Sequence, residues 1–366
     1  MMNKPKIVLR ENIYSALIQK SIEVGEIHGE KKRIYSPSTL FALKFKRIDC
    51  LIEKVVNSED DFFTVIKVKN NNGMLQVSPL GRELMQLLFI EIGELPSLFP
   101  HHQFNPYIQL LAEYSEREEI LLWENRNLYA EYGNALKAAK DLNNFVDLIR
   151  KDLQQACLKK SVNNFERLPR KNHQSLTSYF DDLFQMNSQL LVLRIDLGYQ
   201  KISEDIKKSQ HDNDYNQVQQ FRADFLRSLG KHLSKQLAED ILVGYVWQLN
   251  YSPIQLWHYH MIIFLNGQTV RESLEISKHI DEHWHSITKG QGVYHSYNPQ
   301  PSTLRSVGVG LIERQDDALR EELKQAALYM SMTDYYIKLI TPGKGRTLGR
   351  GTIPTKQNLL GSKAHI

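Results

Sequence analysis

Two apolar stretches separated by a few residues restrict the fold of this chain more than any other feature. Ile241–Tyr251 and Trp257–Leu265 each have the residue choice of a β-strand, and the turn sequence SPIQL lies between them. A link this short cannot carry the crossover that parallel strands need, so the two strands must pair as an antiparallel hairpin. The chain is therefore predicted to contain an antiparallel sheet.

Other strands and amphipathic helices surround this hairpin in sequence. Ser188–Gln200 is predicted to be a strand with one apolar face, because side chains alternate across a strand; that face carries Leu191, Leu193, Ile195 and Leu197. Helices are predicted over Phe221–Asp240, Thr269–Thr288 and Asp317–Ile340, and a further strand over Thr303–Glu313. This order of elements predicts an α+β fold in which helices flank an antiparallel sheet.

The first half of the chain has the composition of a helical accessory domain. Tyr107–Lys160 is rich in Leu, Ala, Glu and Lys, and its apolar residues recur at roughly helical spacing. Phe62–Ser78 is predicted to be a hairpin across Asn-Asn-Asn-Gly. The polar, aperiodic stretch Ser161–Ser175, which contains Pro169, is the predicted boundary. We therefore expect a mostly helical domain over residues 1–165, an α+β domain over 175–340 and a basic tail over 341–366.

Length and composition are those of an ordinary globular protein. The 366 residues are enough for two domains. The two cysteines, Cys50 and Cys157, supply neither a disulfide framework nor a four-thiolate zinc site. No stretch reaches the roughly 18 apolar residues of a membrane helix, and the N-terminus lacks the apolar core of a signal peptide. These features predict a soluble protein in the reducing cytoplasm, with no membrane partner.

Basic residues gather at the C-terminal end. The net charge of +4 permits a nucleic-acid partner without indicating one. From Thr341 to Ile366 glycine is interspersed with basic residues and no acid occurs; the basic residues are Lys344, Arg346, Arg350, Lys356 and Lys363. This composition predicts a mobile cationic arm. It could contact DNA phosphates or serve only as a soluble tail.

Two histidines stand one residue apart at the head of the strand that ends in Asn-Gly. Because residues i and i+2 of a strand face the same way, His258 and His260 project from one side of the sheet and Tyr259 from the other. Two neighbouring imidazoles are half of a site for a divalent metal such as Mn²⁺ or Zn²⁺. The alternative is that one histidine packs in the core and the other is half-exposed.

Tyrosines gather on the last predicted helix. Tyr329 and Tyr336 are seven residues apart, so they share a helix face at about 10 Å along the axis. Tyr335 and Lys338, three apart, share another face. A phenol beside a metal-bound phosphate can attack phosphorus and hold DNA as a covalent ester. Packing in a core is the alternative for these tyrosines.

Taken together, these motifs resemble a known family. The phrases LLVLRIDLGY, GYVWQLNYSP, HYHMIIFLNG and YMSMTDYYIKL, in this order and with helices between them, resemble the histidine-hydrophobic-histidine (HUH) replication initiators. The likeness is greatest to the prophage-borne branch related to the inovirus replication proteins, which includes the YagK/YfjJ C-terminal domain proteins. ITKGQG and GRTLGRG are also part of it, and it covers about Ser175 to Gly351.

The resemblance implies rolling-circle replication initiation by an HUH endonuclease domain. A tyrosine cuts one strand of the origin, holds the 5′ phosphate and leaves a 3′ hydroxyl. His258 and His260 would be ligands of Mg²⁺ or Mn²⁺, Tyr329 the nucleophile and Tyr336 a second candidate. Leu191–Asp196 falls at the first strand motif of the family. The implied partners are single-stranded and origin DNA, with a host helicase or polymerase.

Two positions depart from the family pattern. Asn250 stands where a third, usually acidic, metal ligand is expected, and an amide brings no charge. Met332 stands where the family tends to have a lysine, and Lys338 could replace it only if Tyr335 were the attacking group. The alternative function is therefore a DNA-binding prophage protein whose nuclease has decayed.

A rival motif lies on the helix after the hairpin. His279–His283 reads H-x-x-E-H, the inverted zincin pattern, with Glu282 as a possible base. A zinc peptidase would need a third ligand, for which the candidates are Glu313, Glu321 and Glu322. The alternative is a surface helix whose Ile276, Ile280 and Trp284 pack on the sheet.

Overall fold

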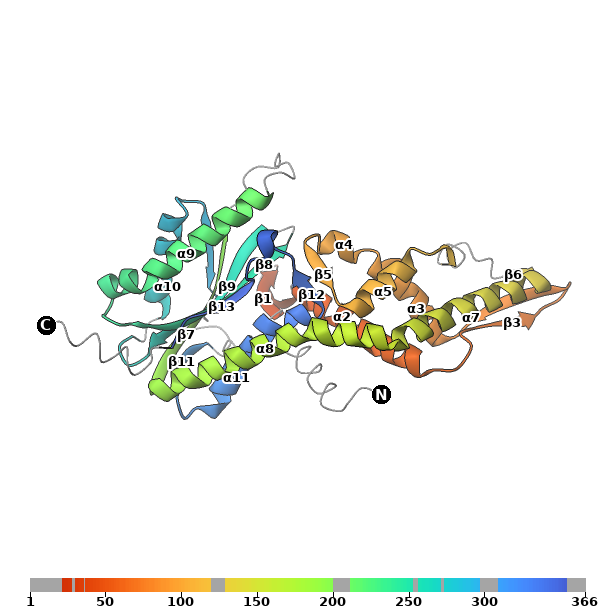
Figure 1. Ribbon diagram of the computed structural model, residues 1–366, viewed down its shortest axis with the longest axis horizontal. Coiled ribbons are helices and arrows are strands. Elements are labelled where there is room, and N and C mark those ends of the chain that lie inside the picture. Colours follow the sequence, from red (N-terminus) through yellow and green to blue (C-terminus); the bar gives the residue numbers. More distant parts are fainter. Residues whose placement is uncertain are drawn as a thin grey trace. The chain divides into compact units, whose positions relative to one another are not determined.

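The chain divides into two compact units. In the computed structural model (Figure 1), the described residues are 22–27, 30–35, 37–119, 129–199, 211–252, 256–270, 273–296 and 309–353. The first unit comprises Met1–Leu168 and Thr333–Lys338, and the second comprises Pro169–Met332 and Leu339–Ile366. The division falls inside one helix, and a short segment near the C-terminus belongs to the first unit.

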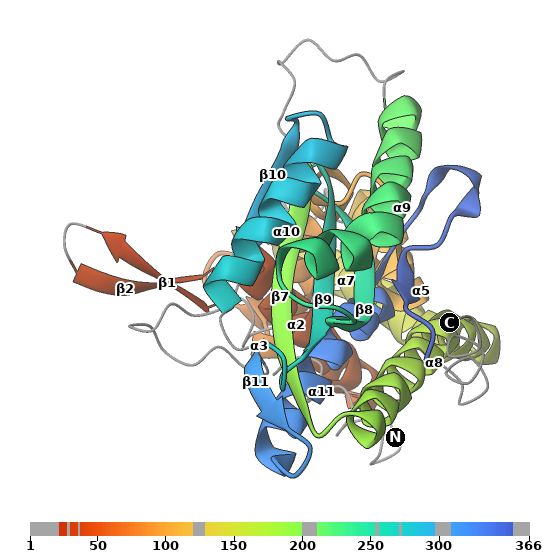
Figure 2. The ribbon, with the colours of Figure 1, turned by 90° about the vertical axis from the view of Figure 1, so that its left-hand side faces the viewer.

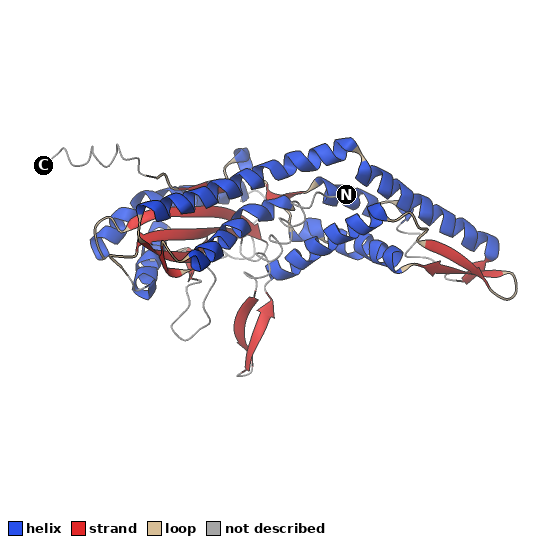
Figure 3. Ribbon diagram, turned by 90° about the horizontal axis from the view of Figure 1, so that it is seen from below, coloured by secondary structure: helices blue, strands red, loops and turns tan. Residues whose placement is uncertain are grey.

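The first unit contains mostly helices and short strands (Figure 3). Its elements are β1 (Ile22–Ile27), β2 (Glu30–Tyr35), α2 (Pro37–Asn57), β3 (Phe63–Lys67), β4 (Asn72–Val77), α3 (Pro79–Gln86), the π-helical segment η1 (Leu87–Ile92), α4 (Leu95–Leu98), β5 (His102–Phe104), α5 (Pro106–Ser115), β6 (Tyr129–Glu131), α7 (Tyr132–Gln154), the first part of α8 (Ala156–Met186), the 3-10 turn η3 (Thr333–Tyr335) and β12 (Ile337–Leu339).

The predicted hairpin of the first unit is confirmed. β3 and β4 pair antiparallel, and Asn70 and Asn71 form the turn with φ of 62° and 56°. Asparagine tolerates this left-handed conformation better than most residues do. The helical prediction over Tyr107–Lys160 holds for α5, α7 and the start of α8, but α5 ends at Ser115 and the unpredicted strand β6 pairs with β4 before α7 begins. Pairing with a distant strand overrides the local helical composition.

The second unit is an antiparallel sheet with flanking helices, so the α+β class is confirmed. Its elements after α8 are β7 (Gln189–Tyr199), α9 (His211–Gln236), β8 (Leu242–Ser252), β9 (Leu256–Asn266), α10 (Ser273–Ile287), β10 (Gly292–Ser296), β11 (Gly310–Glu313), α11 (Asp317–Met332), the 3-10 turn η4 (Pro342–Lys344) and β13 (Leu348–Arg350). The strand order is β10-β7-β9-β8-β13, and β11 also pairs with β7. β8 and β9 form the predicted hairpin.

Helices cover both faces of this sheet (Figures 1 and 2). On one face, here called the α9 face, α9 and α10 pack on the apolar residues that the alternation of β7 predicts: Leu191, Leu193, Ile195 and Leu197. On the other, the α11 face, α8 and α11 pack on Leu190, Val192, Ile262 and Phe264. Both cores exclude water from the long central strands β7 and β9, which explains their near-continuous apolar sequence.

The boundary predicted at Ser161–Ser175 is helical rather than a loop. It lies inside α8, which contains Pro169, although the division between the units does fall at Leu168. The buried residues of the second part of α8 are Leu176, Tyr179, Phe180, Leu183 and Phe184. Their spacing of three and four residues places them on one helix face, and burial of that stripe stabilises the helix despite its polar start.

The last helix is shorter than predicted, and two strands of the sheet in the second unit, β10 and β13, were not predicted. α11 ends at Met332 instead of Ile340, because Thr333–Lys338 belongs to the first unit, where β12 pairs with β5. β10 and β13 add to the sheet, each too short to show alternation in the sequence. The strand predicted from Thr303 begins at Gly310, and residues 303–308 lie outside the described residues.

Among the helices that the structure describes, none combines the length and apolarity that crossing a membrane requires. Cys50 and Cys157 are exposed and form no disulfide.

Candidate functional site

Polar side chains form a row across four strands on the α11 face of the sheet. Asp196 of β7 stands opposite His295 of β10 and opposite His260 of β9. Gln248 of β8 stands opposite His260 from the other side. Directly opposed residues of antiparallel strands lie on one face about 5 Å apart. His295, Asp196, His260 and Gln248 are called the polar row below.

The α11 face changes from apolar to polar along each central strand. The residues of β7 on this face run Leu190, Val192, Arg194 and Asp196, and those of β9 run Phe264, Ile262, His260 and His258. The apolar halves belong to the core beneath α8 and α11. The site therefore begins where that core ends.

Each of the two predicted histidines is held by its Nδ1 atom. Nδ1 of His260 donates a hydrogen bond to the Asp196 carboxylate, and the His260 side chain is 1% exposed. Nδ1 of the half-buried His258 donates to the backbone oxygen of Leu256 at 3.0 Å. Carbonyl and carboxylate oxygens accept, so the Nδ1 atom carries a proton, and in the neutral imidazole Nε2 carries the lone pair. In their neutral form both rings would therefore ligate through Nε2.

The two imidazoles project from the same face, as the alternation predicts. Tyr259 between them is buried in the core of the α9 face. A carboxylate on the second nitrogen of a histidine is the usual partner of a metal-ligating imidazole, because it fixes the ring and raises its basicity. The Asp196–His260 pair has this arrangement.

Tyr329 of α11 lies against His260. The two rings meet edge to face, with centroids 6.0 Å apart and an interplanar angle of 78°. Burial raises the pKa of Tyr329 to about 12; the Asp196 carboxylate also raises it, and Arg194 lowers it. The Tyr329 phenol is therefore protonated at neutral pH, and a carboxylate and a guanidinium both act on it.

Two amides face the histidines from β8. Asn250, the residue expected at the third-ligand position, stands opposite His258, and the buried Gln248 stands opposite His260. Within the described residues, no group of three or more His, Cys, Asp or Glu side chains is arranged to hold a metal ion. The candidate donors at the paired positions of β8 and β9 are two imidazoles and two neutral amide oxygens. Divalent ions such as Mn²⁺ accept this set when water or phosphate oxygens complete it.

Tyr336 and Lys338 lie in the first unit, whereas Tyr329 and the histidines lie in the second. The Tyr336 hydroxyl donates to Asp49 Oδ2 at 2.9 Å. Lys338 Nζ donates to the backbone oxygen of Phe165 and lies 3.7 Å from the centre of its ring. The prediction that Tyr329 and Tyr336 share a helix face is wrong, because α11 ends between them.

Met332 stands where the family tends to have a lysine, and its side chain lies outside those described. Tyr335 does not share a helix face with Lys338 either, since Lys338 stands in strand β12. Asn105 Nδ2 donates to the Tyr335 backbone oxygen at 2.9 Å.

The basic C-terminal residues are partly built into the sheet. Lys344, Arg346 and Arg350 are exposed in the second unit. β13 pairs with β8 through Arg350 opposite Val246, so the expected free arm is wrong for Leu348–Arg350. Arg350 Nε donates to Ser175 Oγ at 3.1 Å. The remaining basic residues of the expected arm, Lys356 and Lys363, lie outside the described residues.

The H-x-x-E-H helix packs on the sheet through its apolar residues. Ile276, Ile280 and Trp284 are buried in the core of the α9 face. His283 Nε2 and Ser228 Oγ are hydrogen-bonded at 2.9 Å. The His283 ring stacks on His232, with ring centroids 4.3 Å apart. A zinc peptidase needs three protein ligands, and the described part of the chain groups no such set. The predicted packing of Ile276, Ile280 and Trp284 on the sheet is confirmed.

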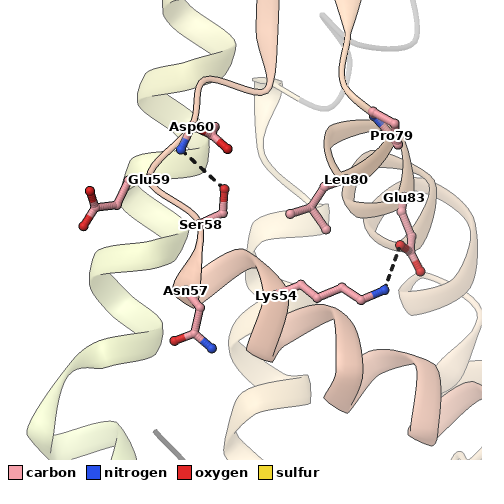
Figure 4. A pocket seen from close by; sticks show the side chains of 8 residues that line it. All are labelled: Lys54, Asn57, Ser58, Glu59, Asp60, Pro79, Leu80 and Glu83. Carbon is pink, nitrogen blue, oxygen red and sulfur yellow. Dashed lines mark hydrogen bonds and ion pairs between the residues drawn. The ribbon is translucent and has the colours of Figure 1, made fainter.

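The first unit has a pocket of its own (Figure 4). Lys54 and Glu83 face each other across it at 3.9 Å, and Glu59 and Asp60 add further carboxylates. None of the predicted site residues lines it. Its excess of acidic side chains is unfavourable for a phosphate backbone.

Residues 154–300 match the sequence model of the YagK/YfjJ C-terminal domain family. The chain is thus similar to this prophage-associated family over α8, β7, α9, β8, β9, α10 and β10. The match includes Arg194, Asp196, His258 and His260 and ends before α11, which carries Tyr329. No curated protein matched the chain, and no solved structure matched it.

No sequence motif assigned a role to Arg194, Asp196, Gln248 or His295. A signal for the first two was present: within LLVLRIDLGY, alternate residues turn from Leu190 and Val192 to two charges. Charged side chains inside an otherwise apolar strand are seldom buried without a function or a partner. Gln248 and His295 have no comparable signal, because only the strand register brings them beside the others.

Proposed function

We propose that the second unit is a metal-dependent DNA strand transferase in which Tyr329 is the nucleophile, as in replication initiators of the HUH type. The observation that carries this proposal is the contact of the Tyr329 ring with His260, on the face that also holds His258 and Asp196. A phenol, two imidazoles and a carboxylate meet at one place, and these are the groups that tyrosine transesterification needs.

His258 and His260 would hold Mg²⁺ or Mn²⁺ through Nε2, with the amide oxygens of Gln248 and Asn250 as candidate further ligands. When bound, such an ion polarises a phosphoryl oxygen as a Lewis acid. Asp196 positions His260 by accepting its Nδ1 proton in a hydrogen bond. This hydrogen bond keeps the His260 ring in one orientation.

Tyr329 would attack the scissile phosphorus with its phenolic oxygen. The new bond joins this oxygen to phosphorus, the bond from phosphorus to the 3′ oxygen breaks, and the 3′ oxygen takes up a proton. Because the pKa of Tyr329 is raised to about 12, its proton must pass to a base during attack. Asp196, the carboxylate that acts on this phenol, is the candidate acceptor.

A second candidate function is sequence-independent or site-specific DNA binding without cleavage. The uncharged Asn250 and Gln248 favour it, because neutral amides bind a divalent cation more weakly than a carboxylate does. Exchanging Asn250 for Glu separates the two candidates. If the natural chain is only a binding protein, the exchange should create cleavage where none existed.

The test is formation of a covalent protein–DNA adduct. The chain is incubated with a pool of random-sequence single-stranded oligonucleotides labelled at the 3′ end, because a 5′-phosphotyrosine retains that end, and with Mn²⁺ or Mg²⁺. A labelled band at the protein's mass on a denaturing gel is expected. It should vanish in Tyr329→Phe and persist in Tyr336→Phe. A band that survives in Tyr329→Phe, or no band from a protein that binds the pool, would contradict the proposal.

A further inference from the structure

Arg194 is a buried cation at the site and has no assigned role. Arg194 is 6% exposed. It lies on the α11 face of β7, two residues before Asp196. A guanidinium stays charged in proteins, so its burial costs free energy unless anionic or polar groups surround it. Asp196, on the same face of the same strand, is an anionic group of this kind.

The strand register places Arg194 next to the proposed reaction centre. Arg194 stands opposite Ile262, which is two residues from His260 on the same face. Such diagonal neighbours lie about 7–8 Å apart, within reach of a long side chain. His260 in turn contacts the ring of Tyr329, which packs against the core of this face. Arg194 therefore lies on the face of the sheet where His260 and Tyr329 meet.

The chemistry of phosphate transfer needs a cation in this space. Negative charge builds on the phosphoryl oxygens and on the phenolic oxygen as the bond to phosphorus forms. A planar guanidinium can donate two parallel hydrogen bonds to a phosphate and adapts to this charge without reorganising. Preorganised donors of this kind are usually the largest contribution to such reactions.

We infer that Arg194 binds the scissile phosphate beside Tyr329 and stabilises the charge that develops during strand transfer. This inference rests on the proposed function and extends it to a residue that neither the histidine pair nor the tyrosine explains. The alternative is that Arg194 only neutralises Asp196 in the core. That structural role predicts a loss of stability but no selective effect on phosphate.

The experiment compares Arg194→Lys and Arg194→Met with the wild-type chain. Arg227→Met is the matched control, because the Arg227 side chain is 72% exposed on α9. Two quantities are measured: the single-turnover rate of adduct formation as a function of DNA concentration, and the affinity for inorganic phosphate by calorimetry in the presence of Mn²⁺. Thermal unfolding of each variant reports whether it folds.

Arg194→Met should lower the maximal adduct rate about 100-fold, as loss of a preorganised donor does, and weaken phosphate binding. Arg194→Lys keeps the positive charge but loses the two parallel hydrogen bonds, so its maximal adduct rate should lie between those of the wild type and Arg194→Met. The control Arg227→Met should match the wild type. If Arg194→Met does not fold, Arg194→Lys decides alone. Folded variants with a wild-type rate and wild-type phosphate affinity would overturn the inference.

Failure of the proposed function is recognised separately. If the wild-type chain forms no adduct but binds phosphate in a way that depends on Arg194, strand transfer is wrong and Arg194 remains a phosphate-binding residue. If the wild-type chain neither forms an adduct nor binds phosphate, both are wrong. If adducts form and the Arg194 variants match the wild type, only the role of Arg194 is wrong.

Discussion

The Asp196 carboxylate accepts a hydrogen bond from His260 Nδ1 across the pairing of β7 with β9. The two residues are 64 positions apart in the chain. Their pairing directs the other nitrogen of His260 away from the carboxylate. It also places an acid beside Tyr329, whose pKa it raises. The histidine motif and the tyrosine helix therefore share one carboxylate.

Asp196→Asn should weaken Mn²⁺ binding by about 10–100-fold, because the ring of His260 loses its anionic partner. Calorimetric titration of Mn²⁺ measures this change. The exposed Asp281 of α10 offers the control Asp281→Asn, which should bind Mn²⁺ as the wild-type chain does. Equal affinities of Asp196→Asn and the wild type would show that Asp196 does not support a metal ligand.

Tyr336→Phe should destabilise the chain by about 1–2 kcal/mol, because Asp49 loses the hydroxyl that donates to it. The stacking of ring 336 on Phe45, whose centroids are 5.0 Å apart, should survive because phenylalanine keeps the ring. Urea unfolding followed by tryptophan fluorescence and by circular dichroism measures the loss. Unchanged stability would mean that the Tyr336 hydroxyl is not held as the structure has it.

Stability should fall as the pH is lowered from about 6.5 towards 4, because burial lowers the pKa of His283 to about 4 and His232 adds to the effect. In this window the unfolded chain binds a proton that the folded chain refuses, so folding becomes less favourable as pH falls. Urea denaturation midpoints at pH 7 and pH 5 measure this loss of stability.

His283→Gln should reduce that dependence on pH, since the amide does not titrate and can still bond with Ser228. The exposed His285 of α10 provides the control His285→Gln, which should retain the wild-type dependence. A His283→Gln profile identical to that of the wild type would assign the dependence to other groups, among them His102, whose pKa burial also lowers to about 4.

Gly349→Ala should destabilise the second unit by about 1–3 kcal/mol, because its new methyl group would lie 2.5 Å from ring atoms of Trp247. Gly133→Ala in α7 is the matched control, since no atom lies within 4 Å of the added carbon. Thermal unfolding measures both. A stable Gly349→Ala variant would contradict the pairing of β13 with β8.

Much of the second unit follows from the sequence because its strands are long. The alternation of β7 and the short link between β8 and β9 are local signals, and both predictions are confirmed. The errors lie where distant contacts override local preference. α8 continues through Pro169 because its later apolar stripe is buried, and the predicted last helix stops early because Thr333–Lys338 joins the first unit.

The candidate site could likewise be predicted only in part from the sequence. Alternation alone placed His258 and His260 on one face of a strand, and the family resemblance marked Tyr329 as the nucleophile with Tyr336 as a second candidate. Sequence spacing could not distinguish the two tyrosines, because their positions depend on where α11 ends. Only Tyr329 lies in the unit that contains the histidines.

The sequence by itself determined which side of each long strand a residue occupies, since the backbone repeats every two residues. The tertiary structure decided which residues meet across strands and helices, because register and packing are set by the whole core. His295, Asp196, His260 and Gln248 come from four strands, and no local pattern relates them. Their common row, with Arg194 and Tyr329 beside it, exists only once the sheet has paired.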